Sequence, residues 1–539
     1  MRYEDLDRKQ QDVVKAVLQG DRKILVLGGA GTGKTTVALW CARKLLEQSV
    51  DQPATRVLFL TFSRSAVSQL IRRSPGIISG YERNVEITTF HSLAYRLLSS
   101  FGRYAAYGKR QLSLQSEARR KLLGDSPGRL VYADLLPGAI NLLNNPEIRK
   151  LVSSRWKLIV CDEVQDTNQE QWELLQILSP PKLLLLGDDR QMIYTFIAGV
   201  SLERFAQVRD SVDQVIELRP VSFRDPSGAI PALAEAIRCR RFDDPAVLAA
   251  LDNGRLSVVR VNDKSEFPEL IKKQITRNLH KEIGVFAHSN AAVAQLADQL
   301  AEANVEHVLI GIPEAHAEAL SAMSAECCVA VGLVTSEEMR TALATFLTAT
   351  TRGSRAPDLA YALLGKAALP GRVETALGQL EAALKTAADG TLGDLVSLAM
   401  GSWRNLHITG GSKSWQNAAG HFRRIAQPYR NRNASDDTVA LLNEAVERSR
   451  IEALIDLDYS ERGRTRLMNY HQTKGREADI VIHIFHNDDY FGPEQEPFEA
   501  LSRLLNVALS RARERVIILL PPNPHALVEP FEALIRGGG

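Results

Sequence analysis

The chain has 539 residues, of which 45% are hydrophobic and 24% are charged, and its formal net charge is only +2. This length is too great for a single hydrophobic core, so several domains are expected, and the composition is that of an ordinary globular protein. The small net charge neither requires nor excludes a nucleic-acid partner, and no apolar run in the sequence is long enough to cross a bilayer.

A phosphate-binding loop is the first functional motif along the chain. The run KILVLGG predicts a strand, TTVALWCARKLLEQ predicts a helix, and the residues between them complete the pattern GxxxxGK[ST]. In such a loop backbone N–H groups face phosphate oxygens, Lys34 reaches the β- and γ-phosphates, and the Thr35 hydroxyl binds Mg²⁺. We therefore predict a nucleotide site with Mg²⁺, formed by Gly28, Gly29, Ala30, Gly31, Thr32, Gly33, Lys34, Thr35 and Thr36.

A pair of acids follows a second apolar run, in the segment WKLIVCDEVQD. Asp162 is expected to hold the metal ion through water, and Glu163 is expected to orient and deprotonate the attacking water. The N-terminus of a helix can show the same pattern. In a chain that also carries a phosphate-binding loop, however, the pair indicates a hydrolytic site.

Ten short motifs follow one another in order from Leu6 to Val516. They are LDRKQQDVV (6–14), GGAGTGKTT (28–36), LFLTFSRSA (58–66), ITTFHSLAYRLL (87–98), VCDEVQDTN (160–168), LLLGDDRQMIY (184–194), LRPVSFRD (218–225), GVFAHSNAA (284–292), MNYHQTKGREADIV (468–481) and LLNVALSRARERV (504–516). Together they resemble the ordered motifs of UvrD/Rep-type superfamily 1 DNA helicases. The stretch from about 315 to 460 carries none of them.

The resemblance implies roles for five residues outside the loop. Gln10 would read one edge of adenine and so select ATP, and Glu477 would contact the ribose. Gln191 would sense the γ-phosphate. Arg224 and Arg511 would reach the same phosphate from distant motifs, because a guanidinium stays charged and binds oxygens bidentately. The segment SFRD keeps only the arginine of the family's Asn-Tyr-Arg-Ser, so a solvated surface position remains an alternative for Arg224.

The resemblance also implies a floor of aromatic side chains on which the bases of single-stranded DNA stack, whatever their sequence. We expect Phe62, Tyr194 and Phe196 in this floor, although each of them taken singly would more simply be a core residue. Further DNA-binding residues are expected at Arg64, His91 and His471. The family usually carries Trp-Arg after the tyrosine, whereas this chain has Phe196 and Ile197. Coupling between DNA and ATP is therefore either weaker here or maintained by another basic residue.

Short apolar runs alternate with helical stretches twice over, which predicts parallel sheets covered by helices on both faces. The predicted strands are 23–27, 57–61, 85–88, 157–161, 182–186 and 213–217, then 256–261, 283–287, 466–469, 480–484 and 515–520. The predicted fold is α/β, and the resemblance implies two RecA-like P-loop domains that each carry a helical insertion. The expected parts are 1–98 and 156–235 for the first domain, 236–314 and 461–539 for the second, and 99–155 and 315–460 for the insertions.

Both insertions read as short and helical. One face of a predicted helix gathers Met339, Leu343, Phe346 and Leu347, and a second gathers Val373, Leu377, Leu380 and Leu384. The run CCVAVGLV, which begins at Cys327 and Cys328, predicts a buried strand rather than a metal site. The basic segment HFRRIAQPYRNRN (421–433) either contacts nucleic acid or is a solvated helix end and loop.

The expected compartment is the reducing cytoplasm. The five cysteines form no CxxC pair, and the N-terminal segment MRYEDLDRKQQD is polar and shows no secretory signal.

The sequence thus predicts an ATP-driven translocase on single-stranded DNA that separates duplexes, moving 3′ to 5′ as the resemblance implies. An alternative is a regulatory subunit whose ATP- and DNA-dependent state is read by a partner, with weak unwinding or none. The short insertions and Ile197 favour this alternative. Compact UvrD-like subunits accompany nucleases in some bacterial antiphage systems, such as Gabija, so the alternative implies a nuclease or another protein subunit as partner. A P-loop ATPase unrelated to nucleic acid would leave the stacking motifs unexplained.

Overall fold

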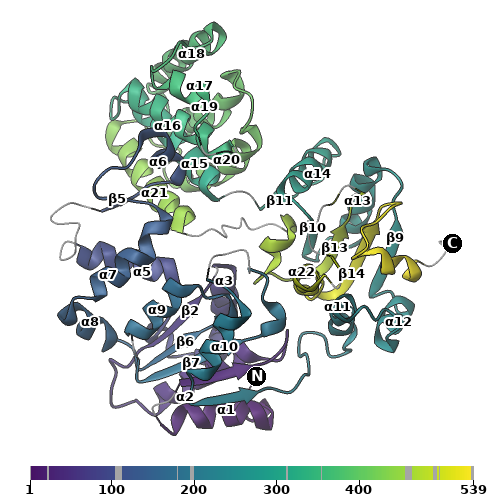
Figure 1. Ribbon diagram of the computed structural model, residues 1–539. Helices are drawn as coiled ribbons and strands as arrows, with labels where there is room; N and C mark the ends of the chain where they lie inside the picture. The colour runs from purple at the N-terminus through teal and green to yellow at the C-terminus, as the bar shows by residue number, and fades with distance from the viewer. Residues whose placement is uncertain are drawn as a thin grey trace. The chain divides into compact units, whose positions relative to one another are not determined.

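The computed structural model describes residues 2–20, 23–62, 64–102, 112–178, 180–194, 199–310, 313–351, 353, 355–455, 464–487, 489, 495–496 and 498–535, although a few side chains within them, that of Arg64 included, lie outside the description. The chain folds into two compact units (Figure 1). Unit 1 comprises residues 1–90, 143–310 and 460–539, and unit 2 comprises residues 91–142 and 311–459.

The first sheet of unit 1 has six parallel strands. In spatial order they are β3 (Val85–Thr89), β2 (Val57–Thr61), β6 (Leu158–Cys161), β7 (Lys182–Gly187), β1 (Lys23–Leu27) and β8 (Gln214–Glu217). Strands β2, β6 and β7 are buried along their whole length, as expected for parallel strands with helices on both faces. Because β6, β7 and β1 are neighbours, the segments that follow their carboxyl ends are brought together.

The second sheet of unit 1 also has six parallel strands. Their spatial order is β11 (Val308–Leu309), β12 (Thr465–Asn469), β10 (Ile283–Ala287), β13 (Ala478–Ile484), β14 (Ala512–Leu520) and β9 (Leu256–Arg260). We call the part of unit 1 around the first sheet the first lobe and the part around the second sheet the second lobe.

Helices cover both sheets. Those of unit 1 are α1 (Arg8–Leu18), α2 (Lys34–Glu47), α3 (Arg64–Arg73), α4 (Pro75–Ile78), α8 (Pro146–Ser153), α9 (Gln169–Leu178), α10 (Leu202–Asp210), α11 (Ala229–Cys239), α12 (Pro245–Asp252), α13 (Phe267–Arg277), α14 (Asn290–Glu302) and α22 (Glu499–Leu509). Helix α1 begins at Arg8 because Asp7 and Gln10 form a capping box, in which each side chain accepts the other's backbone N–H at 3.0 Å.

The predicted α/β fold is confirmed. All eleven predicted strands occur, and each observed boundary lies within three residues of the predicted one. The sequence did not predict β11. This strand has only two residues at the edge of its sheet, which is too short to produce a periodic pattern.

Unit 2 is helical and draws on both predicted insertions. Its elements are α5 (Phe90–Phe101), α6 (Glu117–Leu123), α7 (Leu135–Leu143), α15 (Pro313–Ala330), α16 (Ser336–Thr350), α17 (Asp358–Leu363), α18 (Gly371–Ala387), α19 (Leu392–Asn405), α20 (Ser412–Ala426) and α21 (Asp436–Ile455), with the short parallel strands β4 (Ser113–Leu114) and β5 (Arg129–Leu130).

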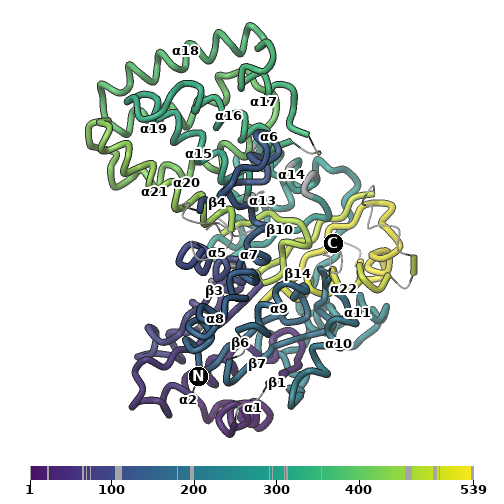
Figure 2. The backbone as a smooth tube through the Cα atoms, turned by 60° about the vertical axis from the view of Figure 1, so that its left-hand side comes forward, coloured from purple at the N-terminus to yellow at the C-terminus, as the bar shows by residue number. Residues whose placement is uncertain are grey.

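Segments from the two insertions pack together in unit 2. Helix α6 lies against α16 (Figure 2). The Arg450 guanidinium of α21 donates to the carbonyl of Leu114 (2.7 Å) and forms a buried ion pair with Glu318 of α15 (3.2 Å). Two stretches that are far apart in the sequence therefore form one body.

The predicted strand at Cys327 and Cys328 is wrong, because both residues lie in α15. They are buried, as predicted, but within a core made by helices. A short apolar run fits a buried helix as well as a buried strand, so periodicity could not separate the two. The predicted apolar faces of α16 and α18 are confirmed as buried. The basic segment 421–433 begins in the last turns of α20, where Phe422 is buried and Arg423 is exposed.

Within the described ranges, no helix has both the length and the mean hydropathy that a membrane-spanning helix needs.

One acid lies inside the helical core of unit 2. Glu326 of α15 is fully buried, and its Oε1 atom lies 2.8 Å from the hydroxyl of Ser402. The Ser402 hydroxyl carries one proton and lies within hydrogen-bond distance of both Glu326 and the carbonyl of Ala399 (2.9 Å), so a protonated Glu326 satisfies both contacts by donating its own proton. Burial raises the pKa of Glu326 well above its ordinary value.

We expect Glu326→Gln to make unit 2 more stable than wild type at pH 8 and little different at pH 4. A carboxyl whose pKa is raised by folding stabilises below its unfolded pKa of about 4.3, and this contribution is lost as the pH rises through the folded value, by up to about 1.4 kcal/mol per pH unit. Urea unfolding at several pH values measures the difference. Glu337→Gln, at an exposed position of α16, should leave the pH dependence unchanged. Parallel wild-type and Glu326→Gln curves would contradict the assignment.

Candidate functional site

A cavity of about 250 Å³ in unit 1 is lined by residues of both lobes. Its lining residues are Gly29, Ala30, Gly31, Thr32, Gly33, Lys34, Thr35, Thr36, Ala66, Gln69, Leu70, Asp162, Glu163, Gln191, Phe223, Arg224, Gly475 and Arg511. Eight of the nine residues predicted for the phosphate-binding loop are among them. Gly28 is not, but its carbonyl accepts a hydrogen bond from the ammonium of Lys34.

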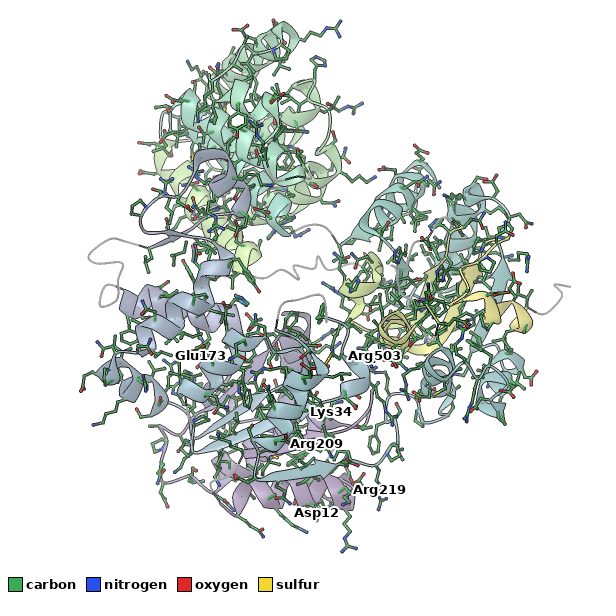
Figure 3. All side chains as sticks on the ribbon, in the orientation of Figure 1. Asp12, Lys34, Glu173, Arg209, Arg219 and Arg503 are labelled. Atoms are coloured by element: carbon green, nitrogen blue, oxygen red, sulfur yellow. The ribbon has the colours of Figure 1, made fainter. Side chains whose placement is uncertain are left out.

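The loop has the backbone conformation that its glycines allow. Gly31 (φ 77°) and Gly33 (φ 88°) are left-handed, and the Gly31 carbonyl accepts the N–H of Phe223 (2.8 Å). Helix α2 begins at Lys34, so its N-terminus faces the cavity. Lys34 lies in the interior of the first lobe, whereas Asp12 and Arg219 lie at its periphery (Figure 3).

The two predicted metal ligands lie next to each other. The Thr35 hydroxyl is 3.5 Å from Oδ2 of Asp162, which follows the carboxyl end of β6. A hydroxyl and a carboxylate at this separation fit Mg²⁺, which takes oxygen ligands and fills its other positions with water and phosphate oxygens.

Glu163 is held as a charged base at the cavity. Its backbone is left-handed (φ 54°), and its Oε2 atom accepts a hydrogen bond from the Gln165 amide (2.6 Å). Burial acts to raise the pKa of Glu163, but the positive charges of Lys474 and Lys34 and the hydrogen bond from Gln165 outweigh it and bring the pKa to about 2. Glu163 is therefore an ionised proton acceptor near neutral pH.

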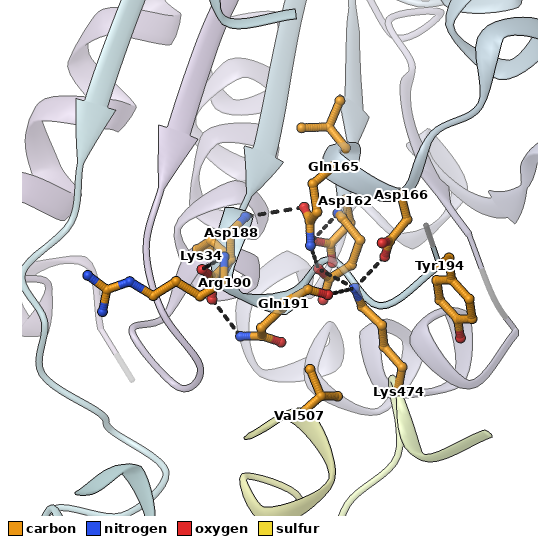
Figure 4. A network of polar contacts seen from close by, with 12 residues as sticks. Lys34, Asp162, Gln165, Asp166, Asp188, Arg190, Gln191, Tyr194, Lys474 and Val507 are labelled. Carbon is orange, nitrogen blue, oxygen red and sulfur yellow. Dashed lines mark hydrogen bonds and ion pairs between the residues drawn. The ribbon is translucent and has the colours of Figure 1, made fainter. Parts of the chain in front are cut away.

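Lys474 enters this acidic cluster from the second lobe (Figure 4). Its buried ammonium pairs with Asp166, lies 3.7 Å from Glu163, and donates to the Gln191 carbonyl (2.7 Å). The same ammonium lies 5.7 Å from the centre of the Tyr194 ring. Sequence reasoning missed this residue. Its signal was a lysine within the quoted motif MNYHQTKGREADIV, but no local pattern identifies the acids that it meets.

Arg511 and Gln191 meet across the cavity. The Arg511 guanidinium donates to the side-chain oxygen of Gln191 (3.3 Å) and to the carbonyl of Val507 (2.8 Å), and the Gln191 amide donates to Asp188 (2.7 Å). Burial lowers the pKa of Arg511 to about 10, so that it stays charged at neutral pH. Two of the three residues predicted to act on the γ-phosphate are thus together.

Arg224 lines the same cavity and is mostly buried, with a side-chain exposure of 16%. Its guanidinium pairs with Glu477 and donates to the carbonyl of Ser510 (2.8 Å). The degenerate motif left open the alternative that Arg224 is a solvated surface residue. The structure does not place Arg224 in such a position. Beside it, Phe223 also lines the cavity with 51% of its surface exposed, and sequence reasoning did not single out this aromatic ring.

Three of the predicted DNA-binding residues come together. The rings of Phe62 and Tyr194 lie 4.8 Å apart at an angle of 31°. The Tyr194 hydroxyl donates to the carbonyl of His471, in the second lobe, at 3.1 Å. Because Lys474 contacts Tyr194 and the acids at once, the aromatic pair is joined to the cavity through one side chain.

The other predicted contacts are placed differently. His91 is in unit 2, where its ring stacks on Tyr132 at 3.8 Å and burial lowers its pKa to about 3.

Gln10, the residue predicted to read adenine, is 1% exposed, and its amide donates to the carbonyl of Thr32 in the phosphate-binding loop (3.1 Å). Phe196 and Ile197 lie outside the described residues, as does the side chain of Arg64. The roles predicted for these residues remain predictions.

Comparison with known proteins finds a matching family model and several curated relatives. A family model described as an AAA domain matches residues 10–197. DNA helicase II of Salmonella typhimurium is 26% identical over 251 residues, which cover 35% of this chain and 34% of that protein. The ATP-dependent DNA helicase PcrA of Staphylococcus aureus is 21% identical over 376 residues, which cover 57% of this chain and 51% of that protein. The chain thus spans between a third and a half of the length of these curated relatives.

We expect Gly31→Ala to weaken ATP binding at least about tenfold, because the left-handed backbone costs a residue with a Cβ about 1–2 kcal/mol. The added Cβ would also lie 2.3 Å from the Ser222 hydroxyl oxygen. Gly29→Ala is the matched control, since its Cβ would meet nothing closer than 3.9 Å. Titration with a fluorescent ATP analogue measures both variants. Equal losses at the two glycines would show that loop geometry is not the cause.

Proposed function

We propose that this chain is a UvrD/Rep-like superfamily 1 helicase, which hydrolyses ATP to move along single-stranded DNA in the 3′ to 5′ direction and so separates duplexes. The observation that carries the proposal is the cavity lined by both lobes, with Lys34 and Glu163 on one side and Arg511 on the other. A triphosphate bound there would be held by both lobes, so that its hydrolysis would change their separation.

The side chains around the cavity suit the steps of hydrolysis. The loop N–H groups and Lys34 bind the phosphates, and Glu163 takes a proton from the attacking water. Gln191 orients that water, and Arg511 stabilises the charge that develops on the γ-phosphate, an effect worth about 10³–10⁵ in rate. Thr35 and Asp162 would hold Mg²⁺, which neutralises charge on the β- and γ-phosphate oxygens when it is bound.

Lys474 supports the coupling of this site to DNA. A base that stacks on Phe62 and Tyr194 would shift the ring over which the Lys474 ammonium lies, and with it the position of that ammonium beside Glu163. In the family motif an arginine usually follows the stacking residues, and this chain has Ile197 there. Lys474 supplies a cation between the same two sites.

The proposal predicts that single-stranded DNA stimulates ATP hydrolysis and that a 3′-tailed duplex is unwound in preference to a 5′-tailed one. Lys34→Ala should abolish hydrolysis and retain DNA binding, because Lys34 belongs to the phosphate-binding loop. ATPase assays with and without DNA, paired with strand-separation assays on both duplexes, measure this.

The outcomes separate the two functions. Stimulation without unwinding would favour a DNA-sensing ATPase subunit that reports its state to a protein partner such as a nuclease. A rate that does not respond to DNA would contradict both.

A further inference from the structure

Glu477 lies between two guanidinium groups. Its side chain is 8% exposed, its Oε1 atom pairs with Arg224, and its Oε2 atom lies 3.8 Å from Arg513 of β14. The resemblance assigns the ribose to Glu477 and the γ-phosphate to Arg224, yet here the two side chains bind each other. Both cannot keep this pairing and also make their full contacts with a nucleotide.

Arg513 is fixed independently of Arg224. Its Nε atom donates to Asp479 at 2.9 Å, and its NH2 atom donates to Glu282 at 2.7 Å. The backbone of Glu477 is also anchored, because Arg466 donates to its carbonyl at 2.9 Å. Only the carboxylate of Glu477 has to move to exchange one arginine for the other.

The exchange matters because the Glu477 carboxylate is buried. A buried carboxylate that loses its partner carries the full desolvation penalty, which opposes any movement of Arg224 away from it. Arg513 removes that penalty by pairing with Glu477 as Arg224 leaves. In this network Glu282, Glu477 and Asp479 pair with Arg224, Arg466 and Arg513, and each of the three acids still has an arginine partner after Arg224 leaves.

We propose that Arg513 is a positioning residue for ATP: it takes over Glu477 when Arg224 turns to the γ-phosphate. The inference rests on the proposed ATP site and adds to it a residue that sets the preference for a triphosphate. ADP lacks the γ-phosphate and does not require the exchange, so Arg513 should act on ATP binding and spare ADP binding.

The test is the ratio of affinities for a non-hydrolysable ATP analogue and for ADP, measured on the full chain by fluorescence titration. Arg513→Met should lower the ratio at least about tenfold through weaker binding of the ATP analogue, with ADP affinity within about threefold of wild type. Arg515→Met is the matched control. It lies two residues further along β14, donates to the Ser257 hydroxyl (2.9 Å), and should leave the ratio unchanged.

Glu477→Gln gives a second, independent readout. A neutral amide holds Arg224 less strongly, so the ratio should rise in this variant. Adding Glu477→Gln to Arg513→Met should restore the ratio that Arg513→Met alone lowers. If wild type binds the ATP analogue but neither Arg513→Met nor Glu477→Gln changes the ratio, the inference is overturned and the proposed function is left intact. If wild type bound neither nucleotide, the proposed function would fail and the inference with it.

Discussion

The ammonium of Lys474 is the group on which the arrangement of the site depends. The first lobe gathers Asp162, Glu163, Asp166 and Asp188 at the ends of neighbouring parallel strands, where the burial of the three aspartates makes the mutual repulsion severe. The second lobe brings a cation into the middle of these acids. Contact between the lobes is therefore favoured by charge. The same cation keeps Glu163 ionised, which a proton acceptor requires.

The positions of these charges follow from the topology of the sheets. In the first lobe the loop after β1, the acids after β6 and the segment after β7 share one edge, because β6, β7 and β1 are adjacent. In the second lobe Lys474 precedes β13 and Arg511 precedes β14, and these strands are also neighbours. Each sheet thus gathers residues that are remote in sequence, and the cavity joins the two sets.

The local patterns in the sequence were enough for much of this. Apolar runs identified the strands, and the spacing of glycine, lysine and threonine identified the phosphate-binding loop, since both signals are carried by adjacent residues. Arg224 and Arg511 were placed through their motifs, and they line the cavity with Lys34.

What the sequence did not reveal depends on contacts between distant segments. Lys474 belongs to a motif that was identified, but its partners lie about 300 residues earlier in the chain. The packing of both insertions into one unit rests on contacts such as that of Arg450 with Leu114. The apolar run at Cys327 is buried by other helices, and an apolar run alone does not distinguish a helix from a strand.

A double-mutant cycle between Tyr194→Leu and Lys474→Met, measured on the stimulation of ATP hydrolysis by single-stranded DNA, tests most directly whether Lys474 joins the aromatic pair to the acids. If it does, the double variant should lose no more stimulation than Lys474→Met alone, which corresponds to a coupling of about 1 kcal/mol. Losses that multiply would show that the two side chains act independently and would contradict the account.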